Sequence, residues 1–121
     1  MNNKEQAKRY NEGKVRLGLI PPFAIEEIGK VFTMGAEKYG AHNWMKGLPY
    51  TEVLDSIERH INEFKKGHDK DKESGLQHMA HVAVNAIFLI EYAAIYTNQN
   101  KFDDRPNKLT PNIFTECGTS L

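Results

Sequence analysis

The apolar residues of the chain recur at helical spacing in three segments, and clusters of turn-forming residues separate these segments. The first segment covers about residues 23–39, with two prolines before it and a glycine after it, as is typical of helix ends. The second begins after Pro49, where Thr51 is expected to cap the first turn, and ends near 66–67. The third begins near residue 73 or 74 and continues to about 97.

Neither an internal repeat nor a period-2 strand pattern occurs along the chain. The pattern therefore predicts an all-α fold, a compact helical bundle of three main helices with a polar N-terminal arm and an extended C-terminal tail. We expect residues 1–97 to form one helical domain and residues 98–121 to form the polar tail.

The third segment is apolar in almost every direction, which predicts a central helix buried nearly all round. Its polar residues are concentrated on one side. At about 100° per residue, a stripe roughly 60° wide contains Ser74, His78, His81, Asn85 and Tyr92. A buried polar group without a partner costs about 1–3 kcal/mol. The stripe is therefore expected to meet a ligand, a metal ion, water or other side chains.

The first two helices add polar residues of different kinds. His60 falls on the apolar side of the second helix, whereas Arg59 points elsewhere. Glu27 falls at the rim of the apolar side of the first helix, where a carboxylate could point along a cleft. Glu26 and Lys30 lie opposite, at the i, i+4 spacing of a solvent-exposed pair.

Histidine is a common metal ligand, and we expect His60, His78 and His81 to converge on one interior site that holds a divalent cation. The alternative is that they are core histidines that donate to carboxylates or to backbone carbonyls. Asp71 and Glu73 precede the third helix, where they would complement its positive N-terminus or hold a divalent cation beside bound phosphates. We favour the interpretation in which these two residues hold a divalent cation.

Two further groups are candidates for binding a ligand. Trp44 and Tyr39 could stack on a base while Asn43 hydrogen-bonds to its edge; the alternative is that Trp44 covers the core. Lys14 and Arg16 lie in an extended, glycine-containing stretch that could reach phosphates, or they are ordinary solvated residues.

Charge and composition narrow the function classes. The 121 residues include 16 basic and 16 acidic side chains, so no net field attracts a polyanion, and duplex DNA is a poor candidate partner. The single cysteine, Cys117, fits a reducing compartment. We find no signal peptide and no apolar run of membrane-span length, and we expect a cytoplasmic protein without a membrane partner.

Several short motifs recur in the order found in a known family. They are Glu12-Gly13-Lys14-Val15-Arg16, Leu19-Ile20-Pro21-Pro22, Gly35-Ala36-Glu37-Lys38-Tyr39-Gly40, Asn43-Trp44, Arg59-His60, Glu73-Ser74-Gly75-Leu76, and His78, His81 and Asn85. Over about residues 9 to 92 the chain resembles the N-terminal domain of phage dATP/dGTP diphosphohydrolases.

This resemblance implies hydrolysis of a purine deoxynucleoside triphosphate to its monophosphate and pyrophosphate, in phages that remodel the nucleotide pool. It also suggests kinship with the all-α MazG-like pyrophosphohydrolases, helical oligomers that use magnesium or manganese. Those enzymes place carboxylates as E-x-x-E on one helix and E-x-x-D on a later one. In this chain His78 and His81 stand at the later site with the same i, i+3 spacing. On the first helix, Glu27 has no second acid three residues on. Imidazoles favour manganese, zinc or another transition metal over magnesium.

The favoured interpretation is a metal-dependent hydrolase in which one or two divalent cations (magnesium or manganese, with zinc possible) neutralise the triphosphate. Glu27, Asp71 or Glu73 would orient the attacking water. The candidates for binding the nucleotide are Lys14, Arg16, Lys38, Asn43, Trp44, Arg59 and Asn85. The rival interpretation is a non-catalytic protein that sequesters a nucleotide, such as a signalling nucleotide, without an essential metal. A helical interaction module would leave the polar stripe unexplained.

The chain also carries more apolar surface than three helices of this length can cover by themselves. We therefore expect a homo-oligomer in which helices pack across a symmetric interface.

Overall fold

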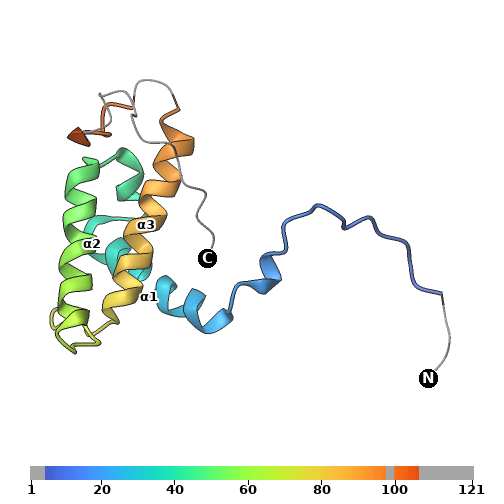
Figure 1. Ribbon diagram of the computed structural model, residues 1–121, viewed down its shortest axis with the longest axis horizontal. Coiled ribbons are helices and arrows are strands. Elements are labelled where there is room, and N and C mark those ends of the chain that lie inside the picture. Colours follow the sequence, from blue (N-terminus) through green and yellow to red (C-terminus); the bar gives the residue numbers. More distant parts are fainter. Residues whose placement is uncertain (1–4, 98–99, 107–121) are drawn as a thin grey trace.

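The computed structural model describes residues 5–97 and 100–106, and three α-helices make up most of it (Figure 1). α1 covers Pro22–Tyr39, α2 covers Tyr50–Lys65 and α3 covers His78–Ile95. These elements confirm the predicted all-α class and the number of main helices.

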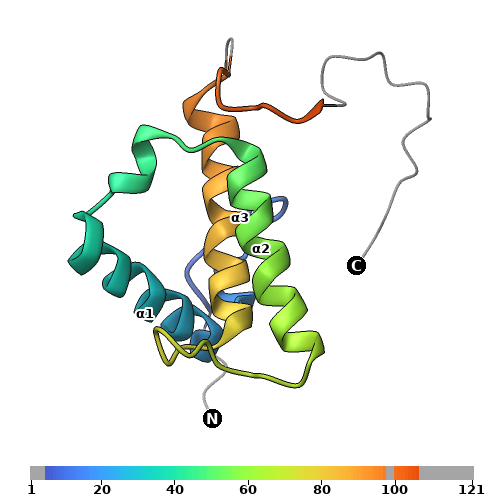
Figure 2. The same ribbon diagram turned by 90° about the vertical axis from the view of Figure 1, so that its left-hand side faces the viewer.

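α3 is the central element of the bundle. It packs against α1, against α2 and against the short 3-10 helix η2 (Asn43–Lys46), and Figure 2 shows α2 in front of it and α1 to its left. A second 3-10 helix, η1 (Leu17–Leu19), precedes α1. Over the described ranges no strand forms, and one isolated antiparallel bridge joins Lys70 to Gln77. The bundle is thus built around one helix with two partners.

Proline and glycine set the helix ends as predicted, but the cap of α2 differs. α1 has Pro22 at its first position and ends where Gly40 adopts φ 95°, a conformation that favours glycine. The prediction that Thr51 caps α2 is wrong. Instead, the Asp104 carboxylate accepts hydrogen bonds from the Thr51 N–H (2.9 Å) and from its hydroxyl (2.7 Å). An acidic residue distant in the sequence therefore accepts a free backbone N–H at the start of this helix.

α3 begins at His78, not at residue 73 or 74 as predicted, and it ends at Ile95, before the predicted end at 97. The late start has a local cause. The Asp71 carboxylate accepts the Ser74 N–H at 2.8 Å, the Asp71 carbonyl accepts the Gly75 N–H at 2.7 Å, and Gly75 adopts φ 73°. This side-chain turn competes with the helix for the same backbone donors, so it holds the preceding residues in a loop.

The core consists of two adjoining apolar clusters along α3. Between α1 and α3, the first cluster contains Val31, Ala80 and Val84, with Ile28, Phe32, Leu76 and Phe88 against them. Between α2, α3 and η2, the second contains Tyr50, Val53 and Tyr92, with Trp44, Ile57, Phe88, Leu89, Tyr96 and Phe102 against them. Tyr92 is fully buried and donates its hydroxyl to the Trp44 carbonyl at 2.7 Å.

Residues 100–105 form a strap that lies against the beginning of α2. The Tyr50 N–H donates to the Phe102 carbonyl at 2.8 Å, and the Asn100 amide donates to the Tyr50 hydroxyl at 2.7 Å. The Phe102 ring packs so closely on Gly47 that a Cβ there would overlap it. The predicted tail beyond residue 97 thus contributes to the folded domain through the strap. Its residues 98–99 and 107–121, with Cys117, lie outside the described residues.

α3 also exposes part of its apolar surface. The predicted burial nearly all round is not reached, because Ile90 is 68% exposed. By length and composition α3, with mean hydropathy 1.4, is the one helix in the described ranges that could cross a membrane, so the expectation that no such run occurs is wrong. Its buried histidines and its contacts with α1 and α2 are the features of a core helix.

Candidate functional site

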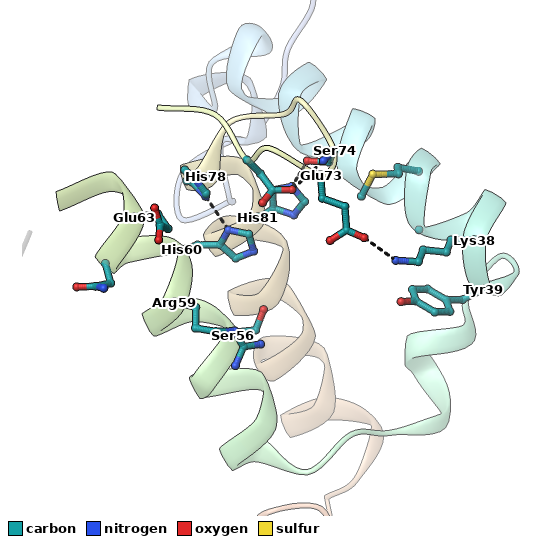
Figure 3. Close-up of a pocket in the computed structure, with 14 residues that line it drawn as sticks. Lys38, Tyr39, Ser56, Arg59, His60, Glu63, Glu73, Ser74, His78 and His81 are labelled. Carbon is teal, nitrogen blue, oxygen red and sulfur yellow. Dashed lines mark hydrogen bonds and ion pairs between the residues drawn. The ribbon is translucent and has the colours of Figure 1, made fainter. Parts of the chain in front are cut away.

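A cavity of about 620 Å³ opens between α1, α2 and the segment that connects α2 to α3 (Figure 3). Lys38 and Tyr39 reach it from α1, and Arg59 and His60 reach it from α2. Its other polar lining residues are Ser56, Asn62, Glu63, Asp71, Glu73, Ser74, His78 and His81. The cavity is therefore lined by imidazoles, carboxylates and cations in one place.

Three histidines form the floor of this cavity. The Nδ1 atoms of His60 and His78 lie 2.8 Å apart, and the rings of His60 and His81 stack in parallel with centroids 4.5 Å apart. His78 and His81 are buried, and His60 is half-buried. The structure thus brings together the three histidines that helical spacing placed on facing sides of α2 and α3.

Asp71 and Ser74 hold the histidine cluster from the connecting segment. While the Asp71 carboxylate accepts the Ser74 N–H, the Ser74 hydroxyl lies 2.8 Å from His81 Nε2. Asp71 Oδ2 is itself 3.9 Å from His81 Nε2. The same turn that delays the start of α3 therefore presents a carboxylate and a hydroxyl to the imidazoles.

The electrostatics of the cluster favour neutral imidazoles beside an ionised carboxylate. Burial lowers the pKa of His60, and the neighbouring His81 lowers it further. Burial also lowers the pKa of His81, although Asp71 opposes this. For Asp71, burial raises the pKa, but hydrogen bonds from Ser74 and the nearby histidines outweigh it and leave the pKa below its usual value. Neutral imidazole and ionised carboxylate are the forms that bind metal ions.

His60, Asp71 and His78 could hold a metal ion, because their ligand atoms all lie within 4.8 Å of one another. Two imidazole nitrogens and one carboxylate oxygen suit manganese, zinc or iron better than magnesium, which prefers oxygen ligands. Every buried side-chain polar atom in the described ranges already has a hydrogen-bond partner, so the cluster is also satisfied as it stands. The donor set thus fits a transition metal.

The cationic side chains lie at the mouth of the cavity. Lys38 Nζ is 3.4 Å from Glu73 Oε1, an ion pair that joins α1 to the connecting segment (Figure 3), and it lies 5.2 Å from the centre of the Tyr39 ring. Arg59 is exposed and lines the cavity, and it forms no ion pair or side-chain hydrogen bond within the described part of the chain. Both cations are in position to meet an anion that enters from solvent.

Comparison with known proteins assigns the chain to a family. The sequence profile described as the N-terminal region of dATP/dGTP diphosphohydrolases matches residues 4–105. The chain belongs to this family. A relative from Salmonella phage PMBT28, named dATP/dGTP diphosphohydrolase, is 38% identical over 97 residues. That match covers 80% of this chain but 32% of the relative, so the chain spans about a third of the relative's length. No solved structure matches.

Some predicted site residues of this family member lie away from the cavity. Glu27 does not line it; the carboxylate pairs with Lys30 at 2.7 Å and accepts a hydrogen bond from Gln77 at 3.2 Å. The predicted pairing of Lys30 with Glu26 is therefore replaced by an i, i+3 pair. The Asn85 amide donates to the His81 carbonyl at 2.8 Å, within α3, and is also absent from the lining.

The predicted base-binding and phosphate-binding residues near the N-terminus also lie elsewhere. Trp44 stacks on Phe88 with centroids 5.0 Å apart, so it covers the core, which was the alternative interpretation. Asn43 belongs to η2 and does not line the cavity. Lys14 and Arg16 are exposed on the N-terminal arm, which extends away from the helices (Figure 1).

Sequence reasoning missed several residues on α2 that line the cavity. Ser56, Asn62 and Glu63 line it beside Arg59 and His60. Positions 56, 59, 60 and 63 follow the i, i+3, i+4, i+7 spacing of one helical face, so the position of His60 would have indicated two of them. Glu63 is held by Lys66 and His68 at 3.2 and 2.8 Å.

Proposed function

We propose that this chain hydrolyses purine deoxynucleoside triphosphates to the monophosphate and pyrophosphate, with a divalent cation bound in the cavity. The observation that carries the proposal is the convergence of His60, Asp71 and His78 on one point inside a cavity that also presents cationic side chains. Membership of the dATP/dGTP diphosphohydrolase family supports the same substrate class. Because the matched relative is longer, residues outside this chain could contribute to its activity.

The three converging side chains would hold manganese or zinc more readily than magnesium, since imidazole is the majority ligand. When bound, the cation would neutralise part of the negative charge of the triphosphate. His81 acts as a support in this proposal and not as a ligand, because its Nε2 faces the Ser74 hydroxyl. The His81 ring stacks on the His60 ring and so keeps His60, one of the proposed metal ligands, in place.

The chain's own residues would bind and orient the substrate. Lys38 would exchange its ion pair with Glu73 for one with a phosphate oxygen, and Arg59 would bind another phosphate through its planar donor pair. The exchange frees the Glu73 carboxylate to accept a proton from the attacking water. Tyr39, which lines the cavity, replaces Trp44 as the aromatic residue that would stack on the base.

The exposed apolar side of α3 supports an oligomeric enzyme. Ile90 is 68% exposed on the central helix, and a second copy packed there would bury it. We place the homo-oligomer in the host cytoplasm, where free nucleotides are the substrate pool, with no nucleic-acid polymer or membrane as a partner. The balanced charge of the chain is consistent with a small-molecule ligand.

The experiment incubates the purified protein with each deoxynucleoside triphosphate and with magnesium, manganese or zinc, and then separates the products. Monophosphate and pyrophosphate in equal amounts, formed fastest from the purine substrates, are the expected result. His78→Asn should abolish product formation, while the matched control His42→Asn, on an exposed loop outside the cavity, should not. Tight binding of intact nucleotide under every metal condition would refute hydrolysis and support the sequestering protein.

A further inference from the structure

The N-terminal arm, residues 5–20, is exposed along its whole length although it carries large apolar side chains. Val15, Leu17 and Leu19 are 84%, 70% and 67% exposed. The arm nevertheless has a local structure, because the Leu19 and Ile20 N–H groups donate to carbonyls within the arm to form η1. Exposed apolar residues held in a defined turn are typical of a segment that binds a protein surface.

An open groove of about 700 Å³ runs along the outer side of α1, where no described element covers it. We call it the α1 groove; its lining residues are Ile25, Glu26, Gly29, Lys30, Thr33, Met34, Glu37, Ser74 and Leu76. Met34 and Ser74 also line the site cavity, so the two depressions adjoin. A chain that lies in the α1 groove therefore ends beside the site.

We propose that the arm of one copy of this chain lies in the α1 groove of a second copy and brings Lys14 and Arg16 to the rim of the second copy's cavity. Leu17 would lie against Thr33 and Met34 in the groove, and Leu19 would lie between them and Ile25. The inference rests on the proposed function for the role of the two cations.

Reach and charge favour a second copy as the occupant. Figure 1 shows the arm directed away from the chain's own helices, and an extended arm of this length spans about 55 Å, so it can reach a neighbouring copy that lies beyond them. The groove has an acidic balance, because Glu26 and Glu37 line it with one cation, Lys30, whereas residues 5–20 of the arm have four basic and two acidic side chains. Opposite charges would thus face each other along the contact.

A triphosphate in the cavity would need more positive charge than the cavity's own lining residues supply. Its cationic lining residues are Lys38 and Arg59, and three carboxylates line it as well, so its own side chains offer a triphosphate no net positive charge. Lys14 and Arg16 from the second copy would supply the missing positive charge. Two sites formed in this way are each incomplete without the neighbouring chain, as in a symmetric dimer with exchanged arms.

The test of the contact is disulfide trapping in the full chain with Cys117→Ser. Protein with Leu17→Cys is mixed with protein with Thr33→Cys, oxidised, and digested for peptide mapping. The expected product is a covalent dimer linked between positions 17 and 33, and the matched control Glu58→Cys, on an exposed position of α2, should give no such link to Leu17→Cys. Absence of the link, or an intrachain 17–33 disulfide in a chain that carries both cysteines, would overturn the proposal. This readout does not depend on activity.

The test of the function is complementation. A chain with Lys14→Ala and Arg16→Ala is mixed and co-refolded with a chain carrying Asp71→Asn. Half of the resulting dimers are mixed, and each has one intact cavity served by an intact arm, so about one quarter of wild-type turnover should return. No recovery from a hydrolytically active wild type would overturn the arm's role. Trapping of the dimer with no hydrolysis by the wild type would refute the proposed function alone.

Discussion

Asp71→Asn separates the folding role of this side chain from its proposed role in binding metal. Asparagine keeps an oxygen that can accept the Ser74 N–H, now 2.8 Å from Asp71 Oδ2, so the turn before α3 should persist. A hydrogen bond to a charged acceptor is worth about 1.5–3 kcal/mol and a neutral one about 0.5–1.5 kcal/mol. We therefore expect the free energy of unfolding to fall by about 1 kcal/mol, which for a domain of this size lowers Tm by roughly 4–8 °C.

The same change should affect catalysis far more strongly. It removes the only carboxylate of the proposed ligand set, and we expect turnover to fall by about 100- to 1000-fold. Product formation at saturating metal and a thermal melt in EDTA measure the two effects. Asp69→Asn makes the same chemical change in the same segment outside the cavity and should not alter turnover. Wild-type turnover by Asp71→Asn would refute the proposed site, and an unfolded variant would show that Asp71 is structural.

Three further results are expected. Manganese or zinc at 100 times its Kd should raise the free energy of unfolding by about 2.7 kcal/mol in urea titrations, and His78→Asn should abolish the gain. Tyr92→Phe should lower the free energy of unfolding by about 1–2 kcal/mol, because the Trp44 carbonyl loses its buried donor. Turnover should not change. Burial lowers the pKa of His60 and of His81, so below about pH 6.5 the unfolded chain binds more protons. The metal-free protein should therefore keep its full stability above that pH and lose it on acidification; a urea midpoint that rises at pH 5.5 would contradict this.

Helical periodicity was sufficient to predict the three helices and the meeting of the histidines. A residue's direction around a helix depends on its position in the sequence and not on distant contacts, so the facing positions of His60, His78 and His81 follow from spacing alone. The stripe also included Ser74, which does contact His81 although it precedes the helix.

Predictions that depended on competition between partners were less successful. Helical spacing allows both Glu26 and Glu27 to reach Lys30, and the structure selects Glu27, whose other oxygen accepts the Gln77 amide. The start of α3 depends on whether Asp71 forms a turn, which periodicity does not measure. The position of Trp44 depends on a neighbour on another helix, Phe88, so an aromatic residue in a loop does not by itself indicate its target.

The strap at residues 100–105 also bears on the order in which the protein folds. Its hydrogen bonds from Thr51 to Asp104 join residues 53 positions apart, whereas each helix forms from local contacts. The closing of so long a loop is favourable only after α2 and α3 have packed, so we expect the strap to dock last and to open first. The Thr51 amide, which is bound by Asp104, should then exchange its hydrogen through openings that leave the amides in the middle of α3 protected. The N-terminal end of α2 would open and close while the histidine cluster near its other end stays folded.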